Sequence, residues 1–121
     1  MVTEESVAAR EPDPSVEHSV LVGGGSLTYR VEDRGVQRPA GYTWQEVSAV
    51  AIDSKDNVFV FNRGDHPVMV FDRDGRFLRS WGEGVFARAH GITIGPDDAV
   101  YCTDDLDHTV RKFTPDGELI W

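Results

Sequence analysis

The sequence has little cysteine, no long apolar run and fewer basic than acidic residues, and each shortage excludes a class of protein. Cys102 is the only cysteine among 121 residues, so no disulfide can form within the chain. No stretch approaches the roughly 20 apolar residues of a transmembrane helix, and the acidic start is unlike a signal peptide. The 12 basic residues are scattered among 21 acidic ones. We therefore expect no nucleic-acid or membrane partner and, by default, a cytoplasmic location.

The sequence does contain one unit written twice. Residues 47–82 and 89–121 align at a constant spacing of 42 positions, without a gap. A period of roughly 40–50 residues with several short strands is typical of a β-propeller blade rather than a helical array. The matching pairs are Ile52/Ile94, Asp56/Asp98, Val58/Val100, Asp65/Asp107, His66/His108, Val68/Val110, Phe71/Phe113, Asp74/Asp116 and Gly75/Gly117.

Each copy alternates apolar runs of strand length with turn-forming residues. The runs are rich in β-branched and aromatic residues, which suit a packed, pleated surface. Gly75 and Gly117, each after an Asp, can take the positive φ that a tight hairpin turn needs. Four strands joined by three turns make one antiparallel blade. The sequence therefore predicts an all-β fold, an incomplete β-propeller of about two four-stranded blades plus a leading strand. In the first copy the runs are 50–52, 58–61, 67–71 and 77–81.

Composition divides the chain into four segments. The first is acidic and has few large apolar groups, which predicts disorder. The second contains a strand at 27–32, where apolar and polar residues alternate, and we expect this strand to be half-buried and able to pair with the last blade. The segments are a disordered acidic leader at 1–20, the leading strand and connector at 21–46, blade 1 at 47–88, and blade 2 at 89–121, expected to be truncated at Trp121.

Positions that differ while their neighbours agree are the better functional candidates. Arg63 in the first copy faces Asp105 in the second, and His90 in the second copy faces Ser48 in the first. His90 begins the innermost strand of its blade, where side chains can point along a central channel. From the residues alone, His90 is either structural or a metal ligand.

Purely structural roles would also explain several of these residues. Asp65 and Asp72 follow Arg63 closely in the sequence, so a surface ion pair with one of them would also explain it. His66 and His108 agree between the copies, and we expect each to bond to the backbone of its turn. Cys102 aligns with Val60, which predicts a small buried core residue.

The Asp-Gly hairpins and the segments Asp-His-Pro-Val and Asp-His-Thr-Val resemble the NHL repeat. More narrowly, residues 47–53, 61–66 and 89–92 resemble, in order, the first blades of the peptidyl-α-hydroxyglycine α-amidating lyase family. The resemblance covers about residues 47–121. It implies a six-bladed propeller that cleaves a C–N bond in a C-terminal α-hydroxyglycine, releasing glyoxylate and leaving a peptide amide.

Carried onto this chain, the resemblance implies that Arg63 is a catalytic arginine and that His90 is one of three histidines around a catalytic zinc. It also implies that the backbone carbonyls of Val50 and Ile92 bind a structural calcium in the channel. The substrate would be a small molecule or a peptide C-terminus. The family's tyrosine base, second arginine and other histidines belong to later blades, so we expect these two blades alone to be inactive. Pro67 follows the Arg-Gly-Asp-His turn directly, where animal lyases carry an insertion.

Two other interpretations remain open. In the first, the chain is part of a non-catalytic NHL propeller, a scaffold that binds a ligand or a protein through Arg63 and His90. In the second, the chain is complete and three copies assemble into one ring. Because blades bury their faces against one another, two blades alone would leave an apolar face uncovered on each side, which predicts marginal stability.

Overall fold

The computed structural model describes residues 20–31 and 35–121, which form nine β-strands. These ranges contain no helix that could cross a membrane. The leader predicted for residues 1–20 lies outside the described residues, apart from Val20. The strands are β1 (Leu21–Gly24), β2 (Leu27–Arg30), β3 (Val47–Ile52), β4 (Val58–Asn62), β5 (Val68–Phe71), β6 (Phe77–Trp81), β7 (Ala89–Ile94), β8 (Val100–Asp104) and β9 (Thr109–Phe113).

Residues 20–31 form a hairpin of their own. β1 pairs antiparallel with β2, and Gly25 at the turn adopts φ 63°. The sequence predicts one half-buried strand here, whereas the structure shows two strands with exposed side chains. The difference follows from the glycines, since Gly23 and Gly25 both take positive φ and let the chain fold back on itself.

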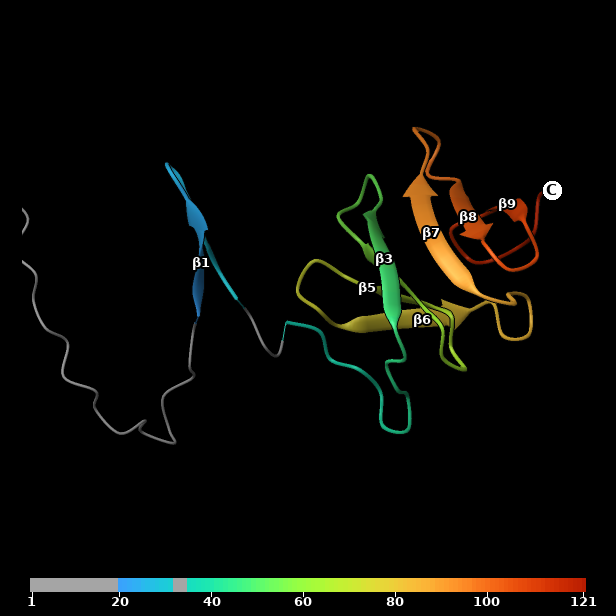
Figure 1. The fold of residues 1–121 in the computed structure, drawn as a ribbon, viewed down its shortest axis with the longest axis horizontal. Helices are drawn as coiled ribbons and strands as arrows, with labels where there is room; N and C mark the ends of the chain where they lie inside the picture. The colour runs from blue at the N-terminus through green and yellow to red at the C-terminus, as the bar shows by residue number, and fades with distance from the viewer. Residues whose placement is uncertain (1–19, 32–34) are drawn as a thin grey trace, which may run out of the picture. The chain divides into compact units, whose positions relative to one another are not determined.

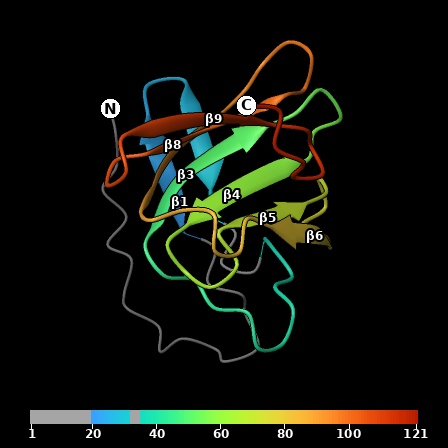
Figure 2. The ribbon, with the colours of Figure 1, turned by 90° about the vertical axis from the view of Figure 1, so that its right-hand side faces the viewer.

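Blade 1 is a four-stranded antiparallel sheet in the order β3-β4-β5-β6 (Figures 1 and 2). Its last turn closes where Gly75, at φ 81°, donates its N–H to the carbonyl oxygen of Asp72. The predicted role of the Asp-Gly pair is confirmed.

Blade 2 contains β7-β8-β9 and the start of a fourth strand. Leu119 bridges Phe113, and the N–H of Ile120 donates to the carbonyl oxygen of Lys112 at 2.7 Å. In blade 1, Phe77 pairs with Phe71, and both of these residues lie 42 positions earlier. The second blade therefore repeats the register of the first, which confirms the fold predicted from the repeat.

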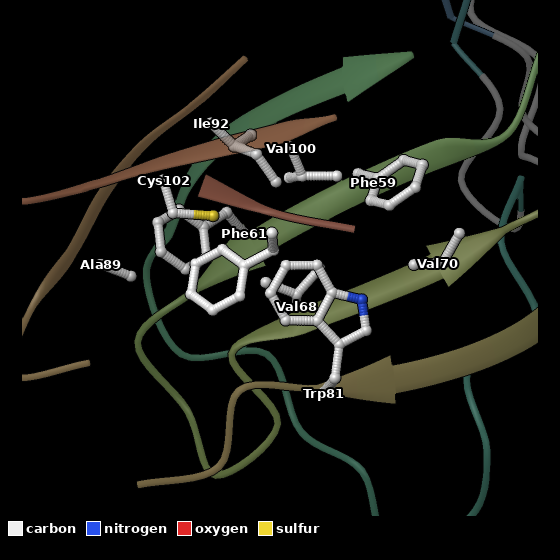
Figure 3. Packing of buried hydrophobic residues seen from close by; sticks show 10 residues of the cluster. Phe59, Phe61, Val68, Val70, Trp81, Ala89, Ile92, Val100 and Cys102 are labelled. Atoms are coloured by element: carbon white, nitrogen blue, oxygen red, sulfur yellow. The ribbon is translucent and has the colours of Figure 1, made fainter. Parts of the chain in front are cut away.

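The two blades share one apolar core (Figure 3). The innermost strands β3 and β7 lie side by side, and β4 also contacts β7. Cys102 is fully buried in this core, as predicted, and burial raises the pKa of its thiol to about 12. Blade 1 contributes Phe59, Phe61, Val68, Val70 and Trp81, and blade 2 contributes Ala89, Ile92, Val100, Cys102 and Phe113.

The opposite face of blade 1 is covered by the connector. Tyr42 and Trp44 pack against Val60, Met69 and Phe71. The expectation that this apolar face is uncovered is therefore wrong over its middle strands. It holds for the innermost strand β3, where Val50 and Ile52 are each 61% exposed.

Candidate functional site

The structure brings together the two functional residues predicted from the differences between the copies. Arg63 directly follows β4, and its Nε donates to the carbonyl oxygen of Ala89 at 3.1 Å. Ala89 is the first residue of β7 and directly precedes His90. A side chain of blade 1 is thus fixed to the backbone of blade 2 beside the histidine.

His90 lies at a β-bulge. The register of the β7–β8 pair shifts between Ala89 and Gly91, and blade 1 has the same irregularity at Ser48. A bulge bends its strand and re-aims the side chain of the extra residue. Ser48 uses its hydroxyl to donate to the carbonyl oxygen of Phe61, whereas the His90 side chain remains 61% exposed. The repeat therefore presents an imidazole where blade 1 has a satisfied hydroxyl.

Four charged residues form two ion pairs near His90. We call these residues the charged rim: Glu46, Arg63, Arg88 and Asp105. Arg63 Nη1 donates to Glu46 Oε2 at 2.5 Å, and Arg88 Nε donates to Asp105 Oδ1 at 2.6 Å. Glu46 aligns with Arg88, and Arg63 with Asp105, at the spacing of 42. The same two positions thus carry an ion pair of opposite polarity in the two blades.

The predicted ion-pair partner of Arg63 was wrong. Neither Asp65 nor Asp72 pairs with it; Glu46, from the loop before β3, does. Sequence distance misled here because the partner lies across the sheet, at the start of the neighbouring strand.

Interactions within the rim stabilise the charged forms of Asp105 and Arg88. The hydrogen bond from Arg88 holds the pKa of Asp105 below its usual range, and His90 and Arg63 lower it further, although partial burial opposes them. The same hydrogen bond raises the pKa of Arg88. His90 Nδ1 lies 3.5 Å from Asp105 Oδ2. Asp105 therefore remains an anion between two guanidinium groups and an imidazole.

A cavity of about 260 Å³ opens beside the rim. It is lined by two cationic side chains, Arg63 and Arg88, and by apolar ones, of which Pro67 and Phe86 are the largest. Such a mixture suits a small ligand that has an anionic group and an apolar part. The remaining lining residues are Asn62, Gly64, Ala87 and Ala89.

Asp104 is a residue of this site that the sequence reasoning missed. Its side chain is 2% exposed and accepts four backbone hydrogen bonds, two on each oxygen. Burial alone would raise its pKa, but these N–H groups outweigh burial and lower it. Asp104 ties the loop that carries Arg88 to the turn that carries Asp105. The donors are Ala87, Arg88, Leu106 and Asp107.

A signal for Asp104 existed in the repeat. Its counterpart is Asn62, a fully buried amide that accepts from the N–H of Gly64 and donates to the carbonyl oxygen of His66. A polar residue that ends an apolar strand in both copies indicates a buried side chain that organises the following turn.

The predicted metal ligands lie on neighbouring strands. Val50 belongs to β3 and Ile92 to β7, which run side by side, so equivalent backbone positions of both blades meet at the inner edge. For zinc, His90 offers one imidazole with the carboxylate of Asp105 beside it. Across residues 20–31 and 35–121 there is no group of three side chains that could hold a metal ion. Zinc at His90 and calcium at Val50 and Ile92 remain predictions.

His66 does not bond to its turn in the predicted way. Its ring stacks on Tyr42 with 3.6 Å between ring centroids, and its Nδ1 lies 3.1 Å from Glu83 Oε1. His66 therefore helps to hold the connector against blade 1, and it is not part of the charged rim.

The four-stranded unit and its repetition at the same register define the fold class: these are blades of an incomplete β-propeller. The chain is homologous to NHL repeat-containing proteins and to amidating enzymes. It is 34% identical over 98 residues to NHL repeat-containing protein 3 of Mus musculus and 30% identical over 95 residues to peptidylglycine alpha-amidating monooxygenase of Rattus norvegicus. Peptidyl-alpha-hydroxyglycine alpha-amidating lyase 1 of Drosophila melanogaster is 42% identical over 43 residues. No family model matches the chain.

Two of these alignments cover more than half of this chain, and all three cover little of the relatives. They include 73% of the chain for the mouse protein, 58% for the rat enzyme and 36% for the fly lyase. The chain spans 28%, 10% and 8%, respectively, of the length of those relatives. The homology therefore supports the repeat and its fold, and it leaves the activity of the whole protein to be proposed.

Proposed function

We propose that this chain supplies one side of the active site of a metal-dependent lyase. The reaction is C–N cleavage of a C-terminal α-hydroxyglycine, which releases glyoxylate. The observation that carries the proposal is the hydrogen bond between Arg63 and the backbone of Ala89, which brings Arg63 of blade 1 beside the residue that precedes His90 in blade 2. The similarity to the fly protein named as an amidating lyase supports it.

Arg63 would bind the carboxylate of the substrate or the oxyanion that develops on it. A guanidinium stays charged at all physiological pH values and offers a planar set of donors that suits a carboxylate. The bond from Nε to the Ala89 carbonyl oxygen and the bond from Nη1 to Glu46 together fix the plane of the group. Arg63 is thus oriented before a ligand arrives, which lowers the entropy cost of binding.

His90 would be one ligand of a zinc ion, with further imidazoles from other blades. When bound, zinc would supply a Lewis acid that lowers the pKa of a hydroxyl group. Asp105, at 3.5 Å, is placed to restrain the imidazole. The carbonyls of Val50 and Ile92 would bind calcium, which prefers oxygen ligands.

The test measures zinc content and glyoxylate release for the protein as its gene encodes it and for two variants. His90→Ala should lower the zinc content, because one ligand is lost. Arg63→Met should keep the zinc but lower kcat/KM about 100-fold or more, as expected for loss of a charged group that stabilises an oxyanion. Asp65→Ala, on the same turn, is the matched control. Unchanged zinc in His90→Ala together with unchanged turnover in Arg63→Met would refute the proposal.

A second function is a binding propeller without chemistry. The alignment with NHL repeat-containing protein 3 favours it, because it covers more of the chain at higher identity than that with the rat enzyme. In this case the rim and its cavity would recognise an anionic ligand or a protein. Removal of metal with a chelator separates the two functions, since binding without chemistry would survive it.

A further inference from the structure

Glu46 pairs with the guanidinium group of Arg63, the group that the proposed function assigns to the binding of a ligand. Its carboxylate accepts from Arg63 Nη1, and no other side chain is hydrogen-bonded to that nitrogen in the described residues. A carboxylate here has the same charge and geometry as the carboxylate of a substrate. Glu46 therefore stands where an anionic ligand would bind.

Glu46 holds this position in an unfavourable backbone conformation. Its φ is 46°, in the left-handed region that non-glycine residues rarely adopt. Arg88, at the equivalent position of blade 2, does not share this conformation. Strained residues persist where the surroundings hold them, and they concentrate at functional sites. One such restraint is the hydrogen bond from the N–H of Arg63 to the carbonyl oxygen of Gln45, at 2.8 Å.

Of the two ion pairs in the rim, this one is built to open. The Arg88–Asp105 pair has two hydrogen bonds, at 2.6 and 3.0 Å. The Arg63–Glu46 pair has one. The side chain of Glu46 is 71% exposed, whereas that of Arg63 is 32% exposed and is fixed by Ala89. Glu46 can therefore leave while Arg63 stays in place.

We infer that Glu46 is a built-in competitor of the anionic ligand, a gate that a carboxylate must displace to reach Arg63. The inference rests on the proposed role of Arg63 as an anion-binding group. It adds a residue that sets affinity and selectivity, because neutral ligands would not compete for the guanidinium while Glu46 occupies it. Weak anions would be kept out, and a ligand with further contacts in the cavity would be admitted.

The experiment uses the 121-residue chain labelled with ¹⁵N and follows the backbone N–H signals of Gly64 and Ala89, which line the cavity in every variant, during titration with N-acetylglycine at low salt. Glu46→Gln should bind this probe about twofold to fivefold more tightly than the unmodified chain, the range expected for loss of one exposed ion pair. Glu83→Gln changes the net charge equally but removes a partner of His66 rather than of Arg63, so its affinity should match the unmodified chain. Arg63→Met should abolish binding in every background.

The outcomes separate the gate from the function beneath it. Equal affinity in Glu46→Gln and Glu83→Gln, with binding lost in Arg63→Met, overturns the gate and leaves the role of Arg63 intact. Binding that persists in Arg63→Met overturns the proposed role of Arg63 and the gate together. Absence of probe binding in Glu46→Gln overturns the inference, since the competitor has then been removed without opening a site.

Discussion

Blade 1 and blade 2 have the same backbone arrangement, but the faces that they turn toward the next blade carry different side chains. On β4, Phe59 and Phe61 are fully buried against blade 2. The equivalent residues on β8 are Tyr101 and Thr103, which are partly exposed on the open side of blade 2. The repeat therefore conserves hydrogen-bond register and turn geometry, while the side chains of each face depend on what covers that face.

The strand ends differ even more than the faces. The ion pair of the rim is Glu46–Arg63 in blade 1 and Arg88–Asp105 in blade 2, so the charges are exchanged between equivalent positions. The buried polar residue beside them changes from Asn62 to Asp104. Because the four charged residues of the rim are not part of the shared core, their chemistry can vary without changing the blade.

The largest effect should come from breaking the face between the blades. Phe61→Ala removes a fully buried ring that contacts Phe86 edge-to-face, and we expect a loss of about 3–5 kcal/mol in the free energy of unfolding. Thr103→Ala, the same position of blade 2, should cost less than about 1 kcal/mol, since the residue is partly exposed. Urea denaturation of both variants measures the difference. Similar costs at the two positions would contradict the asymmetry of the faces.

A second break targets the glycine that packs under Trp81. Gly117 has φ 90°, and a Cβ atom there would lie 2.4 Å from Trp81 Cγ. Gly117→Ala should therefore cost about 2–4 kcal/mol, from backbone strain and from the clash together.

Gly84→Ala is the control for that variant. Gly84 also has positive φ, 71°, but a Cβ atom there would meet nothing within 4 Å. Its cost should be that of the strain alone, about 1–2 kcal/mol. Thermal unfolding of the two variants gives the contribution of the packing by difference, and equal losses would mean that Trp81 shifts freely.

The sequence predicts the blades well because the repeat reports backbone requirements directly. Both Asp-Gly turns and the burial of Cys102 follow from local chemistry and alternation. The connector could not be predicted, because the packing of Tyr42 and Trp44 on blade 1 depends on a face that exists only after folding. Arg63 was predicted as a candidate, but its partners Glu46 and Ala89 lie 17 and 26 positions away along the chain. Spacing in sequence carries no signal for such contacts.

The third prediction concerns the buried carboxylate that blade 1 lacks. Asp104→Asn should destabilise the chain at pH 7 by about 1–3 kcal/mol, because an amide oxygen cannot accept all four N–H groups and leaves buried donors unpaired. Blade 1 offers no matched variant, because the amide of Asn62, the counterpart of Asp104, does not ionise. Asp104→Asn is therefore compared with the unmodified chain over a range of pH.

The sign of that pH dependence is fixed by the lowered pKa of Asp104. Burial opposes the shift, but the backbone N–H groups prevail, so the folded pKa lies below the unfolded value near 3.8. The stabilisation is therefore complete above the unfolded pKa and is lost as the pH falls through the folded one. The difference in stability between the chain and Asp104→Asn should shrink below about pH 4. A difference that stays constant from pH 7 to pH 2 would show that ionisation of Asp104 is irrelevant.

The smallest effect should come from exchanging the rim charges of blade 2, which gives it the polarity of blade 1. The double variant Arg88→Glu/Asp105→Arg keeps an ion pair and the net charge but places like charges near Glu46 and Arg63, and we expect a loss of only about 1 kcal/mol in the free energy of unfolding, because both side chains are substantially exposed. Each single variant should cost more than the double, since it places like charges together, and the excess should fall as salt is added. A double-mutant cycle in low and high salt measures this coupling. If the exchange itself cost several kcal/mol, the fold would require the polarity of each ion pair. The difference between the blades would then reflect stability rather than the binding of a ligand.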